Sequence, residues 1–271
     1  MKKLFLGSVA LVALGLGAPA FAADRAVPAY APPPPPAPVY TWTGCYVGAS
    51  AGTSTGRSTQ STVANSVLTS PLGVPAPFAA PAGSDIAGDL NLSGFIGGFE
   101  GGCNYQVGAW VIGVEVDGSA TNKEGQNFET ALVPFDVRRA NWISQTQERW
   151  LVTARGRLGL SGWGWFGDKS MLYVTGGAAW AKIDTSEFLI GVQTGTGHQE
   201  SNTRSGWTIG GGWEYALGYG WSVKGEYLYV KFDDYTTFTS PPFASNNIAP
   251  RNVKLYDNII RAGMNYKIGW Y

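Results

Sequence analysis

The chain of 271 residues has one histidine and two cysteines, which leaves little material for a metal site or a cofactor, and we expect none. Only 14% of the residues are charged, against roughly 25% in ordinary soluble domains. The 19 basic side chains balance the 19 acidic ones, and without a basic excess the chain is not expected to bind nucleic acid. Beyond the N-terminus it has no apolar run of about 20 residues, which excludes a polytopic helical membrane protein.

Glycine and aromatic residues are abundant instead. The chain contains 38 glycines, aromatic residues make up 13% of it, and its mean hydropathy is −0.05. Few charges and many aromatics at neutral mean hydropathy are typical of strands that alternate between a lipid face and a polar face.

The N-terminus predicts a secretory signal. Lys2 and Lys3 precede a run of 13 apolar residues, and the A-x-A site that follows predicts cleavage between Ala22 and Ala23. Removing the two lysines leaves 17 basic against 19 acidic side chains. Residues 23–41 contain seven prolines and predict an extended periplasmic segment. We expect residues 42–271 to form one domain.

Apolar and polar side chains alternate with a period of two in eight segments, which predicts eight strands with one apolar face each. The segments are residues 43–51, 95–105, 110–117, 150–160, 172–180, 207–215, 221–229 and 260–270. In the third segment, for example, Val114 and Val116 alternate with Glu115 and Asp117.

Two features favour a membrane barrel over a soluble sandwich. Aromatic residues gather at the segment ends, as in the interfacial girdles of outer-membrane barrels. The connections alternate between short turns (residues 106–108, 161–169 and 218–220) and long polar loops (residues 57–92, 120–149, 184–204 and 233–252). We therefore expect an all-β, eight-stranded antiparallel up-and-down transmembrane β-barrel in the outer membrane of a Gram-negative type of cell, with both termini in the periplasm.

Several motifs resemble the strand signatures of the porin-family outer-membrane β-barrel proteins, often called outer-membrane immunogenic proteins, which have an OmpA-like barrel. They are residues 42–48 (WTGCYVG), 102–106 (GCNYQ), 150–159 (WLVTARGRLG), 172–177 (LYVTGG), 221–229 (WSVKGEYLY) and 265–267 (NYK). The resemblance implies a barrel without catalytic residues that meets the host or the environment through its loops. Many members end at an aromatic residue just after the last motif, where this chain has Ile268, so the assembly machinery would read Trp270 or Tyr271 instead.

Cys45 and Cys103 are directed to an oxidising compartment. By the alternation, both face outward near the short-turn end of neighbouring antiparallel strands. A cross-strand disulfide is our hypothesis, and two free thiols are the alternative.

Nine charged residues fall on the inward faces of the expected strands. An eight-stranded barrel encloses just enough room for its own side chains, so unpaired charges there would be costly, and we expect them to pair across the lumen. The set could be a structural plug or a gate that passes small ions or water. Its members are Glu100, Glu115, Asp117, Arg155, Arg157, Glu214, Lys224, Glu226 and Arg261.

Two other motifs carry little weight. Gly162, Gly164 and Gly167 match a dinucleotide-binding pattern, but a strand rather than a helix is expected after them, so we interpret them as a turn. His198 is the sole histidine and is expected inside the third long loop, where nothing would hold it against a nucleophile.

The sequence therefore predicts a non-enzymatic barrel with a structural and surface-interaction role, in contact with outer-membrane lipid and, through its loops, with a possible surface or host ligand. The first alternative is a narrow passive channel. The second is a ligand- or haem-binding surface, for which the chain supplies only His198 and scattered tyrosines.

Overall fold

The computed structural model describes residues 40–63, 66–69, 75–129, 142–162, 167–189, 198–238 and 250–268. The predicted signal with its cleavage site at Ala22 and Ala23, nearly all of the proline-rich segment, and the terminal Trp270 and Tyr271 lie outside these ranges. They remain predictions. Within the described residues, no helix has the length and apolar character needed to cross a membrane.

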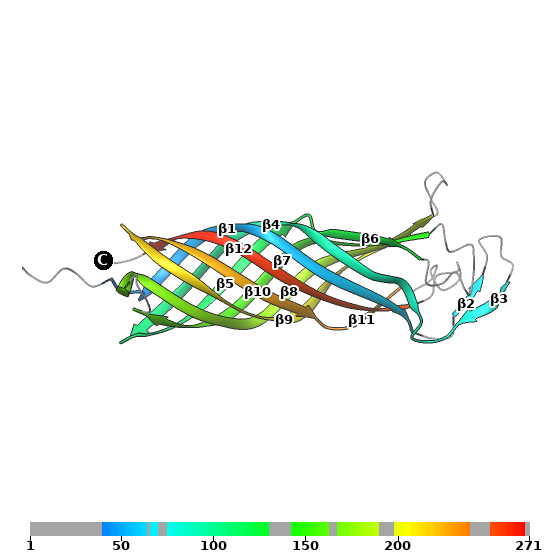
Figure 1. The fold of residues 1–271 in the computed structure, drawn as a ribbon, viewed down its shortest axis with the longest axis horizontal. Helices are drawn as coiled ribbons and strands as arrows, with labels where there is room; N and C mark the ends of the chain where they lie inside the picture. Colours follow the sequence, from blue (N-terminus) through cyan, green and yellow to red (C-terminus); the bar gives the residue numbers. More distant parts are fainter. Residues whose placement is uncertain are drawn as a thin grey trace, which may run out of the picture. The chain divides into compact units, whose positions relative to one another are not determined.

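Eight long strands form a closed antiparallel ring (Figure 1). Each strand pairs with the one before and after it, and β1 closes the ring by pairing with both β4 and β12. This confirms the predicted eight-stranded up-and-down barrel. The strands are β1 (Gly44–Thr62), β4 (Asp85–Val107), β5 (Trp110–Thr121), β7 (Trp142–Ser161), β8 (Ser170–Leu189), β9 (His198–Gly218), β10 (Trp221–Phe232) and β12 (Arg251–Ile268).

The strands extend into the first three predicted long loops, so the predicted boundaries of those loops are wrong. The fourth, residues 233–252, matches the gap between β10, which ends at Phe232, and β12, which begins at Arg251. β1 continues to Thr62 and β4 begins at Asp85, inside the expected loop of residues 57–92. Outside a hydrocarbon layer the outward side chains can be polar, so the apolar alternation stops although backbone pairing continues. Shorter strands lie within the predicted long loops. They are β2 (Ser66–Thr69), β3 (Pro75–Ala80), β6 (Glu124–Phe128) and β11 (Tyr235–Thr237).

The short turns lie at the other end of the ring, where β1 begins and β12 ends. Cys45 pairs with Ile268 there, so the barrel begins and ends beside the turns. The turn from β9 to β10 places Gly218, Tyr219 and Gly220 at positive φ values of 105°, 52° and 83°. Tyr219 is 95% exposed, so its strained backbone carries an aromatic ring outward at the rim.

The outer wall is apolar over its central part. Phe99, Val114, Val174 and Ile260 are each at least 60% exposed, which would be unfavourable in water and is suited to lipid. The alternate side chains point inward and are buried, including most of the charged residues of these strands. The fold therefore keeps its apolar face outside and its polar face inside.

Candidate functional site: the charged barrel interior

The structure places all nine inward-facing charged residues in the barrel interior, with no more than 4% of any residue exposed. They are close enough to form one network. Glu100 comes from β4, Glu115 and Asp117 from β5, Arg155 and Arg157 from β7, Glu214 from β9, Lys224 and Glu226 from β10, and Arg261 from β12.

Arg155 joins three carboxylates from two sides of the lumen. One Nη atom lies 2.5 Å from Glu115 and 3.0 Å from Asp117, and the other lies 2.8 Å from Glu226. β7 and β10 do not pair with each other, so the contact to Glu226 crosses the barrel. Such charge-assisted hydrogen bonds fix the position of the side chain in a low-dielectric interior.

Arg157 is held by charge and by aromatic rings. It lies 2.7 Å from Glu214 and 3.2 Å from Glu115, and it donates a hydrogen bond to the hydroxyl of Tyr46. Its guanidinium carbon also lies 4.0 Å from the centre of the Tyr173 ring, which is cation–π distance.

Arg261 and Lys224 complete the network on the opposite wall. Arg261 lies 2.8 Å from Asp117 and 2.7 Å from Glu226. The Lys224 ammonium lies 2.7 Å from Glu100. Each of the four cations therefore has carboxylate partners, as expected for charges that are removed from water.

Two tyrosines whose positions the sequence did not indicate also belong to this network. Tyr46 donates to Glu115 over 2.6 Å, and Tyr173 donates to Glu226 over 3.1 Å. Each ring lies against a glycine on the neighbouring strand: a Cβ atom built at Gly102 or Gly212 would fall within 2.6 Å of a tyrosine hydroxyl. These close approaches require glycine, which explains two of the inward-facing glycines of the wall.

Toward the long-loop end, two further groups of charges lie inside the barrel. Lys123 is completely buried, 2.8 Å from Glu148 and 2.5 Å from Asp257. These residues were missed because they fall in or beyond segments that were expected to be loops. The continuing inward parity of the strands was the signal that could have found them.

The second group surrounds Arg251 at the first position of β12. Its guanidinium lies 2.7 Å from Glu129 and 2.8 Å from Glu187, and 5.3 Å from the centre of the Phe238 ring. A buried apolar cluster that includes Leu90, Leu151, Leu228 and Phe232 occupies the same half of the barrel. Charged and apolar groups thus follow one another along the interior.

At the long-loop end, the segment after β10 turns toward the barrel interior. Phe238 is fully buried at a φ of 60°, and its N–H donates to the carboxylate of Glu200 over 2.7 Å. Thr237 and Asn202 donate to the same carboxylate. Partial burial by itself would raise the pKa of Glu200, but these hydrogen bonds outweigh it and hold the pKa below its usual value.

At the short-turn end, Trp42 packs into a buried cluster with Val111 and Met171. Its side chain is 4% exposed, and its indole N–H donates to Ser161 over 3.2 Å. Its backbone N–H donates to Gln106 over 2.7 Å, and Lys267 donates to the carbonyl of Thr41 over 2.9 Å. These bonds attach the chain before β1 to the rim of the barrel.

Cys45 and Cys103 face outward, lie directly opposite each other on β1 and β4, and form a disulfide. This confirms that the two thiols are joined across neighbouring strands. The loop it closes is long in sequence, but the strand register already holds the two residues together.

His198 does not lie inside a loop as expected. It is the first residue of β9 and pairs with Glu187 of β8, because the two strands extend beyond the apolar belt. Gly167 begins a single 3₁₀ turn (Gly167–Lys169, η3) that leads directly into β8, so the glycine motif is followed by a strand and not by an α-helix. Among the described residues, no three His, Cys, Asp or Glu side chains are grouped to hold a metal ion.

Comparison with known proteins identifies relatives at the level of the family. The model of the outer membrane protein beta-barrel domain matches residues 8–267. Two curated relatives, the 31 kDa outer-membrane immunogenic proteins of Brucella melitensis and Brucella suis, are each 29% identical over 169 residues. The alignments cover 62% of this chain and 64% of the relatives, so the chain spans less than two thirds of their length.

Solved structures with a similar chain trace include other outer-membrane proteins. Neisserial surface protein A is 14% identical, with a TM-score of 0.38, over 83% of this chain and 98% of that chain. The attachment invasion locus protein Ail of Yersinia pestis is 12% identical, with a TM-score of 0.34, over 83% and 99% of the two chains.

The family match covers nearly the whole chain and agrees with the closed ring of eight strands and its apolar outer wall. It also confirms the resemblance indicated by the strand motifs. This protein therefore belongs to the outer membrane protein beta-barrel domain family.

Proposed function

We propose that this outer-membrane barrel is closed to solutes, braces the membrane and interacts through its surface. The observation that carries the proposal is the interior network, in which Arg155 and Arg261 join carboxylates from different walls of the barrel. An eight-stranded barrel has room for little besides its own side chains. Trp42 at one end and Arg251 with its partners at the other add further obstructions.

The structural plug is favoured over a gate by the energetics of the network. Opening a path for ions would require several buried charge pairs to separate at once, and each uncompensated buried charge costs about 3–5 kcal/mol. Thermal motion of one side chain does not open such a network. A narrow passive channel is therefore the alternative that conductance measurements must exclude.

We further propose that the short turns and both termini face the periplasm and that the long loops face outward. The predicted signal and proline-rich segment support this orientation, as does the extension of paired strands beyond the apolar wall at the long-loop end only. The loops would then be accessible to a surface or host ligand, and the assembly machinery would read Trp270 or Tyr271. We propose no cofactor and no catalytic role. The chain has one histidine, His198, and the described residues hold no group of three His, Cys, Asp or Glu side chains placed to bind a metal ion.

Single-channel recording tests the closed state. The mature chain is refolded, folding is verified by its shifted gel mobility before heating, and the protein is inserted into planar bilayers. We expect no discrete conductance steps. The double variant Arg155→Ala/Arg157→Ala distinguishes a structural plug from a gate. Conductance steps that appear only in the variant support a plug. Steps in the parent that the variant leaves unchanged would overturn the closed barrel.

A further inference from the structure

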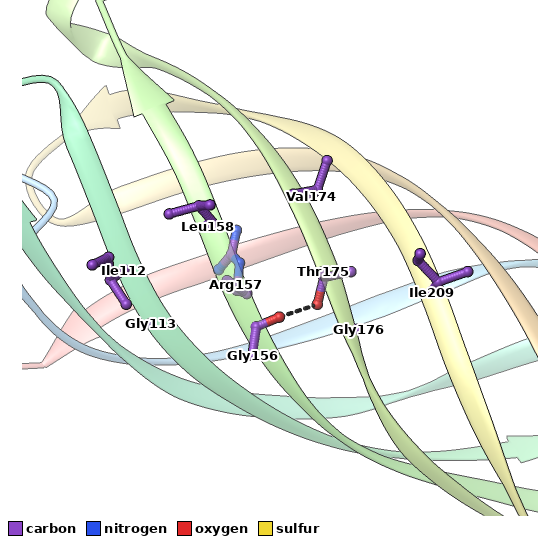
Figure 2. A pocket seen from close by; sticks show the side chains of 9 residues that line it. All are labelled: Ile112, Gly113, Gly156, Arg157, Leu158, Val174, Thr175, Gly176 and Ile209. Atoms are coloured by element: carbon purple, nitrogen blue, oxygen red, sulfur yellow. Dashed lines mark hydrogen bonds between the residues drawn. The ribbon is translucent and has the colours of Figure 1, made fainter.

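A shallow groove lies on the outer wall between bulky side chains of four adjacent strands (Figure 2). It has a volume of about 400 Å³, and its floor is formed by Gly156 of β7 and Gly176 of β8, which lie directly opposite each other. Ile112 and Leu158 stand on one side, and Val174 and Ile209 on the other. The groove exists because two neighbouring strands both lack a side chain at the same level.

Beyond the groove, the outward face of β7 and β8 runs toward the long-loop end. Its next pair after the two glycines is Ala154 and Ala178, which are small, and the pair after that is Val152 and Trp180. We call the part of this outward face between Gly156 and Trp150 the track. It is six residues long, or about 20 Å at roughly 3.3 Å per residue. With the usual strand tilt of about 45°, this track spans about 14 Å of membrane depth, close to half of the ~30 Å hydrocarbon core. A single acyl chain of one leaflet fits that length.

Cations lie where the track leaves the apolar belt. Lys182 is paired in register with Trp150, and Arg149 adjoins Trp150 in the chain. Half of the Arg149 side chain is exposed, and its Nε atom donates to Asp184, which also lies at this edge. Two cations against one carboxylate leave one positive charge beside an aromatic residue, at the depth where lipid headgroups begin.

We propose that this track binds one phosphate-bearing lipid of the outer leaflet, with an acyl chain over Gly156 and Gly176 and a headgroup phosphate at Lys182 and Arg149. The apolar floor and the net positive charge at its end complement the two parts of such a lipid. The proposal rests on the orientation proposed above, which sets the leaflet. The test below is made in detergent and depends neither on orientation nor on conductance.

The experiment measures lipid retention by native mass spectrometry of the full mature chain in a neutral detergent. The probe is bisphosphorylated lipid A, compared with the same lipid after removal of its phosphates and with inorganic phosphate alone. We expect one retained lipid A, weaker retention of the dephosphorylated lipid, and no displacement by inorganic phosphate. Equal retention of both lipids, or displacement by free phosphate, would overturn the assignment.

Matched variants locate the site. Gly156→Leu fills the floor, and its Cβ has space because the nearest atom is the Gly176 carbonyl oxygen at 3.9 Å. Its control is Gly225→Leu on β10, where no atom lies within 4 Å. Lys182→Ala removes a cation at the track, and Lys231→Ala on β10 is its control. We expect the two track variants to weaken retention about five- to tenfold, a loss of up to about 1.4 kcal/mol, while the controls retain lipid as the parent does. If the track and control variants lose lipid retention equally, the groove contacts lipid no more specifically than the rest of the outer wall does, and the proposal is wrong.

Discussion

Replacing Arg155 by methionine tests whether the interior network stabilises the barrel as described. The side chain is fully buried and has three carboxylates within 3.0 Å of its Nη atoms. Of the nine clustered charges, five are acidic and four are basic, so the substitution leaves five carboxylates facing three cations. Removing one partner of a buried charge network costs about 3–5 kcal/mol, because the remaining charges keep their desolvation penalty.

Arg57→Met on β1 is the control. Arg57 forms an ion pair with Asp89, and about half of each side chain is exposed. Exposed pairs contribute about 0–1 kcal/mol. The free energy of unfolding of both variants can be measured in lipid vesicles over a urea series, with the folded fraction followed by gel mobility. We expect Arg155→Met to lose at least 2 kcal/mol more than its control, an estimate from the two ranges above.

Neutralising a carboxylate should rescue part of the loss. Glu226 lies 2.8 Å from Arg155 and 2.7 Å from Arg261, so Glu226→Gln is itself expected to destabilise the parent. Combined with Arg155→Met, it removes one carboxylate that has lost its partner. The double variant should therefore lose about 0.5–3 kcal/mol less stability than the two single variants lose in sum. A loss of stability for Arg155→Met that is no greater than the loss for Arg57→Met would refute this account of the network.

Other parts of the structure give three further predictions. Val114→Arg should cost ~2–4 kcal/mol because the Val114 side chain is 62% exposed on the lipid face. Thr236→Arg, at the exposed middle position of β11, should change stability by no more than about 0.5 kcal/mol, and equal costs would contradict the face assignment. Thiol titration of the denatured, unreduced protein should find neither Cys45 nor Cys103 free, and Cys45→Ser should cost at most ~4 kcal/mol. The lowered pKa of Glu200 means that its stabilisation of β11 is present above the unfolded value of about 4.3 and is lost as pH falls through the folded value. The protection factors of the β11 amides, which correct for the slower intrinsic exchange in acid, should therefore fall at low pH, and Glu200→Gln should abolish that change.

The amino-acid sequence by itself determined the strand count, the two faces and the nine interior charges of the central network. Successive side chains of a strand point to opposite faces, so parity alone assigns Val114 to the outside and Glu115 to the inside without any knowledge of neighbouring strands. The same parity placed Cys45 and Cys103 on the outer face, where the structure joins them.

Register and strand length were decided only by closure of the ring. Parity does not say which residue of one strand lies opposite which residue of the next, so the contact between Arg155 and Glu226, and the meeting of Gly156 with Gly176, could not be derived from the chain. Backbone pairing beyond the lipid needs no apolar side chain, and for that reason the buried Lys123 was hidden in a segment whose sequence predicts a loop.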